Sequence, residues 1–186
     1  MITIKHRINT ISQLLTVDDA CGVETDVRVA NGKLVLAHDP YNYGEDFESF
    51  LKVYNHKVLV LNIKDSGIED DVIEITKKYL DGKDFFLLDV EIPYLVSKKG
   101  VHKEYLSCRF SEFETFESLI NFRKHSDWVW IDTFNNLPDL NKDIVEYLYT
   151  KKTCLVSPKR WGREDELGKY LDTMKFFNFK PNFVMV

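Results

Sequence analysis

The opening third of the chain carries side chains whose types and order could cleave a phosphodiester. They are two histidines, two acids and two cations: His6, Arg7, Glu24, Asp26, His38 and Lys64. Histidines can move protons, paired carboxylates can bind a hard metal ion, and arginine and lysine can neutralise phosphate oxygens. This set is the strongest functional signal in the sequence.

The segments that must position these side chains have the pattern of β-strands. Strands are expected near residues 2–8, 23–29, 34–37 and 57–64. The functional side chains lie in or directly after these segments. An Asn31-Gly32 pair between the second and third segments predicts a tight hairpin turn.

The strand at residues 23–29 places Glu24, Asp26 and Arg28 on one face and valine or threonine on the other. In a parallel sheet both faces are covered, so two adjacent acids on one face need an explanation. Like charges side by side repel unless a cation joins them. We therefore expect Glu24 and Asp26 to bind Mg²⁺ or Ca²⁺; the alternative is the polar side of a half-exposed strand.

Strand and helix patterns alternate along the rest of the chain. Further strands are expected near residues 84–90, 105–110, 127–134, 153–157 and 182–186. This rhythm predicts parallel βαβ units, and eight main strands predict a compact (β/α)8 TIM-type barrel over one domain, residues 1–186. A doubly wound open sheet is the alternative. The chain ends inside the expected eighth strand, so we expect the eighth helix to be missing, through truncation or cover by a partner.

The second half of the chain gives two further candidates at strand ends. In barrel enzymes the carboxyl ends of the strands supply the site. Arg109 is therefore expected to bind substrate, and Asp132 to bind the metal ion. The other histidines, His56, His102 and His125, stand in polar contexts and are expected to be solvated.

Composition narrows the class of protein. The chain has 186 residues, a net charge of −5 and 44% hydrophobic residues, which is ordinary for a globular domain and unsuited to general nucleic-acid or anionic-membrane binding. Its three cysteines are widely spaced, so no disulfide framework or zinc site is indicated. Signal-peptide and membrane-spanning patterns are lacking, so we expect a cytoplasmic protein without membrane insertion.

Five motifs in order resemble the glycerophosphodiester phosphodiesterase family of phospholipase-C-like barrels. That family has a His-Arg pair, a Gly-Val-Glu-x-Asp-Val strand, an Asp/Asn-Gly turn, a Val-x-His-Asp segment and a strand ending in Asn-Ile-Glu-Ile-Lys or similar. The matching segments here are His6-Arg7, Gly22-Val-Glu-Thr-Asp-Val27, Asn31-Gly32, Val35-Leu-Ala-His-Asp39 and Leu61-Asn-Ile-Lys64. The resemblance covers about the first third of the chain.

The resemblance implies a metal-assisted hydrolase of a small glycerol- or polyol-phosphodiester. His6 and His38 would be its acid and base, in either assignment, with a cyclic phosphate between two steps. Arg7 and Lys64 would bind the phosphate. Asn62 stands where the family has a third metal-binding acid, and an amide oxygen can bind a hard cation but brings no charge. Asp132 is a candidate to supply that charge.

Two departures from the family keep other functions open. Ile8 replaces the usual glycine after His-Arg, and Asn62 replaces an acid. These changes favour a barrel that binds a phosphorylated ligand without cleaving it. A lyase that releases the cyclic phosphate and an assembly subunit that forms homo-oligomers through its terminal strand are further alternatives.

Overall fold

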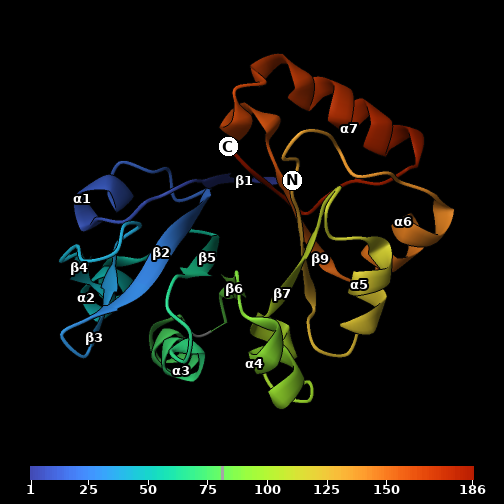
Figure 1. The fold of residues 1–186 in the computed structure, drawn as a ribbon. Coiled ribbons are helices and arrows are strands. Elements are labelled where there is room, and N and C mark those ends of the chain that lie inside the picture. The colour runs from blue at the N-terminus through green and yellow to red at the C-terminus, as the bar shows by residue number, and fades with distance from the viewer. Residues whose placement is uncertain (81) are drawn as a thin grey trace. The chain divides into compact units, whose positions relative to one another are not determined.

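The computed structural model describes residues 1–80 and 82–186 and has a mixed α/β fold (Figure 1). The strands among these residues are β1 (Ile2–Lys5), β2 (Gly22–Ala30), β3 (Lys33–Leu36), β4 (Glu45–Asp46), β5 (Val58–Ile63), β6 (Asp84–Leu88), β7 (Ser107–Phe110), β8 (Trp128–Ile131), β9 (Lys152–Val156) and β10 (Phe183–Met185). The α-helices are α1 (Ile11–Leu14), α2 (Phe47–Val53), α3 (Glu69–Tyr79), α4 (Ile92–Ser97), α5 (Phe116–Asn121), α6 (Lys142–Leu148) and α7 (Leu167–Phe176). Short 3₁₀ helices are η1 (Lys103–Tyr105), η2 (Pro158–Trp161) and η3 (Glu164–Glu166).

The chain divides into two compact units. The N-terminal unit comprises Ile4–Tyr94, and the C-terminal unit comprises Met1–Thr3 with Leu95–Val186. The expectation of one domain over residues 1–186 stays a prediction.

In the N-terminal unit, β2 is the central strand. It pairs in parallel with β1 and with β5, and β5 pairs in parallel with β6. The register places Asp26 opposite Asn62. β3 pairs antiparallel with the end of β2, on the edge opposite β5, and β4 pairs antiparallel with β3. α2 packs against β3 (Figure 1). The predicted hairpin turn is confirmed, since Asn31 and Gly32 both have positive φ, as this type of turn requires.

The core of this unit buries polar residues of its strands together with the apolar ones. Every residue of β5 is buried, and so is β2 from Gly22 to Val27. A Cβ atom at Gly22 would lie 2.3 Å from Cγ1 of Val58, so glycine is required where β2 approaches the start of β5. Both faces of β2 are covered, as expected for a parallel strand.

The C-terminal unit is built on four parallel strands in the order β10-β9-β8-β7. Trp128 and Trp130 of β8 are each 1% exposed and lie in its core. The strands are separated in sequence by α5, α6 and α7, which Figure 1 shows in yellow to red.

The structure confirms the alternation of strands and helices and corrects several details. The first strand ends at Lys5 rather than near residue 8. The predicted capping box is present, with Thr10 and Gln13 at the start of α1. His56 is buried, not solvated, and its Nε2 lies 3.0 Å from the carbonyl oxygen of Val17. That expectation was wrong because a polar sequence context does not reveal that the segment after α1 contacts this ring.

The pairing of the described strands does not form a closed ring, so the (β/α)8 barrel stays a prediction. Among the described residues, no helix is long and apolar enough to cross a membrane.

Candidate functional site

Arg7 is the residue through which the predicted side chains meet. It is the second residue after β1 and has a φ of 55°, a left-handed conformation that is uncommon outside glycine. Its backbone N–H donates to Oε2 of Glu24 at 2.8 Å, and its Nη2 donates to Nε2 of His38. Strained backbone of this kind persists only where the surroundings fix it, and it is often found at functional sites.

Glu24 lies at the centre of the cluster and is fully buried. Its Oε1 accepts a hydrogen bond from Nδ2 of Asn62 at 3.1 Å, and its Oε2 lies 3.7 Å from Nε2 of His6. Burial raises the pKa of Glu24, and the neighbouring charge of Asp26 raises it further. The hydrogen bonds from Arg7 and Asn62 oppose this increase only in part.

Asp26 is 1% exposed and is held from two sides. Its Oδ2 accepts from Nδ2 of Asn9 at 2.7 Å, and its Oδ1 lies 3.1 Å from Nζ of Lys64. Asn9 also accepts from the backbone N–H of Asp26 and from the hydroxyl of Thr25, so one amide fixes the strand and the carboxylate together. The sequence reading missed Asn9, because it lies in the irregular segment after β1 and belongs to no recognised motif.

His38 is placed by hydrogen bonds to both its ring and its backbone. A guanidinium only donates, so Nε2 of His38 accepts from Arg7, and the ring proton lies on Nδ1, which donates to Oδ1 of Asp39 at 2.7 Å. That hydrogen bond lowers the pKa of Asp39. Nε and Nη2 of Arg28 donate to the carbonyl oxygen of His38 at 3.1 and 2.9 Å, and Arg28 is itself paired with Asp65 at 2.9 Å. The ring is therefore in the tautomer that leaves a lone pair on Nε2.

Two buried oxygens of this cluster are not used in hydrogen bonds. Oδ1 of Asn62 is buried and accepts no hydrogen bond, and Oδ1 of Asp26 has the Lys64 ion pair but no hydrogen bond. Together with Glu24 they form an all-oxygen set, which Mg²⁺ and Ca²⁺ prefer. In the part of the chain that the structure describes, no group of three or more His, Cys, Asp or Glu side chains is arranged to hold a metal ion. A cation held here would therefore depend on the amide of Asn62.

Arg109 and Asp132 lie in the C-terminal unit and bind one another. Asp132 also accepts from the backbone N–H of Thr133 at 2.8 Å and from Nε1 of Trp130 at 3.3 Å. Nε of Arg109 lies 3.4 Å from Oε1 of Glu114. These contacts are those of a structural ion pair, and the roles expected for Arg109 in substrate binding and Asp132 in metal binding stay predictions.

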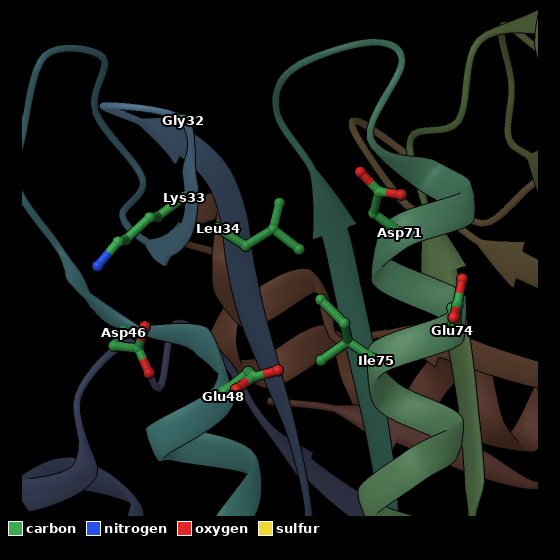
Figure 2. A pocket seen from close by; sticks show the side chains of 8 residues that line it. All are labelled: Gly32, Lys33, Leu34, Asp46, Glu48, Asp71, Glu74 and Ile75. Atoms are coloured by element: carbon green, nitrogen blue, oxygen red, sulfur yellow. The ribbon is translucent and has the colours of Figure 1, made fainter.

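A hollow of about 530 Å³ lies between the β2–β3 turn and α3 in the N-terminal unit (Figure 2). Four acids line it, Asp46, Glu48, Asp71 and Glu74, with Lys33 as the cation among them. This excess of negative charge repels a phosphodiester. The hollow is therefore unsuited to bind the substrate on which the His6–His38 cluster would act.

The cluster thus joins seven residues that the sequence reading selected, by contacts within one unit: His6, Arg7, Glu24, Asp26, His38, Asn62 and Lys64. It combines two imidazoles, two cations and two buried acids, which suits acid–base chemistry on an anionic ester.

A scan against models of known protein families finds no match for this chain, and a search of curated proteins finds no significant relative.

Proposed function

We propose that the chain is a metal-assisted phosphodiester hydrolase that acts on a small glycerol- or polyol-phosphodiester. The observation that carries this proposal is the double contact of Arg7, whose backbone bonds Glu24 and whose guanidinium bonds His38. It brings one buried acid, one cation and one imidazole together, and these groups would supply charge and proton transfer to an anionic ester.

Arg7 and Lys64 are the phosphate-binding groups of this mechanism. Each cation has a partner within the protein: Arg7 donates a hydrogen bond to His38, and Lys64 forms an ion pair with Asp26. A phosphate oxygen that takes a hydrogen bond from Arg7 releases the lone pair on Nε2 of His38. Binding of the ester and exposure of the base are then one event.

His38 is the base of the first step. The carboxylate of Asp39 holds the Nδ1 proton and stabilises the ring once Nε2 becomes protonated. A hydroxyl of the substrate loses its proton to Nε2 and attacks phosphorus. The bond from phosphorus to the leaving alcohol breaks, and His6 protonates the departing oxygen.

The first step yields a cyclic phosphate, and the second step opens it with water. Water gives its proton to the histidine that was the acid, its oxygen bonds to phosphorus, and the other histidine returns a proton to the ring oxygen that leaves. The roles of His6 and His38 could be exchanged with the same residues. A divalent cation held by Glu24, Asp26 and Asn62 would supply charge for the phosphate oxygens when bound.

Phosphorus NMR of a glycerol-based phosphodiester tests the proposal, with added Mg²⁺ or Ca²⁺ and with chelator. We expect the diester signal to be replaced by a phosphomonoester, more slowly with chelator and much more slowly in His6→Ala. His102→Asn is the matched control, because asparagine tolerates the left-handed backbone at this position. Full activity in His6→Ala would remove the mechanism, and a persisting cyclic phosphate would identify a lyase.

The amide at Asn62 favours a second candidate, a protein that binds a phosphorylated ligand without cleaving it. Asn62 uses its amide hydrogens on Glu24 and adds no negative charge to the cation site. A stable complex with an intact diester in the same NMR experiment would support this function.

A further inference from the structure

A second hollow of the N-terminal unit, of about 440 Å³, is built from the segment that follows His38. Pro40, Tyr41 and Tyr43 line one part of it, and Arg28 and Asp65 line another. Arg28 also donates two hydrogen bonds to the carbonyl oxygen of His38. Arg28 therefore contacts both the hollow and His38, and the lining residues 40–43 follow His38 closely in the chain.

Its two tyrosine rings are unusually exposed. Tyr41 is 99% exposed and Tyr43 is 81% exposed, although large aromatic side chains normally bury most of their surface. Flat exposed rings beside a hollow are surfaces on which a ligand can stack.

The remaining lining combines polar side chains with Val29 and Ala30, and it offers no unpaired charge. Nε and Nη2 of Arg28 bond His38 and its Nη1 bonds Asp65, whose other oxygen accepts from the backbone N–H of Val29. Asn31 and Asn42 add two amides to the lining. A phosphate would find no uncommitted cation here, an ammonium group would find its carboxylate already neutralised, and an acyl chain would meet polar groups.

We propose that this hollow binds a sugar ring, as one of the two alcohols of the diester. The inference rests on the proposed function and deepens it. The carbon–hydrogen faces of a sugar pack on aromatic rings, and its hydroxyls exchange hydrogen bonds with amides and carboxylates. The volume falls within the range of small-molecule sites, about 300–1,000 Å³. Phosphate would lie at Arg7 and Lys64, and the sugar at the tyrosines.

The experiment is a binding titration with methyl glucoside, followed by NMR of the ¹⁵N-labelled full chain, with glycerol as the comparison ligand. We expect shifts centred on residues 28–31 and 40–43 for methyl glucoside and weaker ones for glycerol. The double variant Tyr41→Asn with Tyr43→Ser removes both rings, and asparagine tolerates the positive φ of 65° at position 41. Its affinity for methyl glucoside should fall about tenfold or more.

Phe176→Ser is the matched control, since this ring on α7 is 84% exposed and lies outside the hollow. Its affinity should equal that of the wild type. Absence of shifts with methyl glucoside, or equal affinity in the double variant, overturns the inference.

The two proposals fail separately. Cleavage of glycerol diesters without sugar binding overturns the sugar site and leaves the hydrolase. Sugar binding that depends on the tyrosines, without cleavage of any diester, supports the sugar site and overturns the hydrolase.

Discussion

Two clusters of buried charge, one in each unit, are similar in composition and differ in how completely their polar atoms are satisfied. In the C-terminal unit, Asp132 is bonded by Arg109, Trp130 and Thr133, and both of its oxygens accept. In the N-terminal unit, a buried oxygen of Asn62 has no hydrogen-bond partner, and one of Asp26 has only the ion pair with Lys64. Fully hydrogen-bonded oxygens are typical of a structural ion pair. Buried oxygens without hydrogen bonds are typical of a ligand-binding site.

The backbone shows the same contrast. Arg109 and Asp132 lie in or directly after regular strands, whereas Arg7 has a left-handed conformation and holds two other residues of its cluster. Strain next to unsatisfied buried atoms weakens a fold, so its presence favours a role in binding or catalysis. The comparison predicts opposite results when the two clusters are mutated.

The largest effect is expected for His38→Ala in the N-terminal cluster. Loss of the proposed base should lower the rate of diester cleavage by about 10²–10⁴-fold, because that is the usual contribution of a positioned proton acceptor. Thermal unfolding should change little, since the side chain of His38 is 38% exposed. The measurement is initial rate by phosphorus NMR, with circular dichroism to verify folding. A rate within a few fold of His102→Asn would contradict the assignment.

In the C-terminal cluster the expected effect of Asp132→Ala is on stability. The variant removes the main partner of the Arg109 guanidinium and should lower the free energy of unfolding by about 1.5–3 kcal/mol, the range for hydrogen bonds to charged groups. Urea unfolding measures this change. Cleavage per folded molecule and its response to Mg²⁺ should stay as in the wild type.

The outcome of Asp132→Ala also decides the metal role expected for Asp132 from the sequence. Loss of the Mg²⁺ response with unchanged stability would break the comparison and support that role. Glu114→Ala is the control. Glu114 is a more exposed partner of Arg109, with a side chain that is 42% exposed, so its loss should lower stability less than Asp132→Ala.

The sequence was most informative where a motif and a strand coincide. The pattern around Glu24 and Asp26 predicted a covered strand with two acids on one face, and β2 is buried from Gly22 to Val27. The Asn31-Gly32 turn and the Thr10–Gln13 capping box were also predictable, because local hydrogen bonds and backbone preferences determine them.

Contacts from irregular segments could not be predicted in the same way. Asn9 contacts Asp26 through loop geometry, and no periodicity or motif marks it. His56 has a polar sequence context and is buried all the same, since burial depends on which distant loop covers a residue. Asp132 was selected from its position at a strand end, and its partners could be recognised only in three dimensions.

Asn9→Ala should reduce activity through Asp26 rather than through the substrate. The change leaves an oxygen and the backbone N–H of Asp26 without a hydrogen-bond partner, which costs about 1–3 kcal/mol. We expect weaker Mg²⁺ affinity and a rate about tenfold lower, with partial recovery at high Mg²⁺. Asn55→Ala, at an exposed asparagine that bonds Asp19, is the control. A lower rate that Mg²⁺ does not restore would argue against a positioning role.

The smallest effect, and the one that best separates binding from stability, is expected for Glu24→Gln. Because burial and Asp26 raise the pKa of Glu24 above its ordinary value of 4.5, ionisation of this group is less favourable in the folded chain than in the unfolded one.

The pH dependence of Glu24→Gln follows from this shift. The wild type loses stability as pH rises from about 4.5 towards the folded pKa, and a glutamine at position 24 does not titrate. Asn62 can turn its amide so that its unused oxygen accepts from that glutamine. Without metal, the variant should therefore be more stable than the wild type near neutral pH, by about 0.5–2 kcal/mol, and the difference should shrink as pH falls towards 4.5.

Added Mg²⁺ or Ca²⁺ favours the ionised carboxylate and should stabilise the wild type alone. Urea unfolding near neutral pH and near pH 4.5, each with and without the cation, measures the stability of both proteins under these four conditions. Equal stability of the two proteins under every condition would mean that Glu24 carries no buried charge that a cation relieves, and the contrast with Asp132 would disappear.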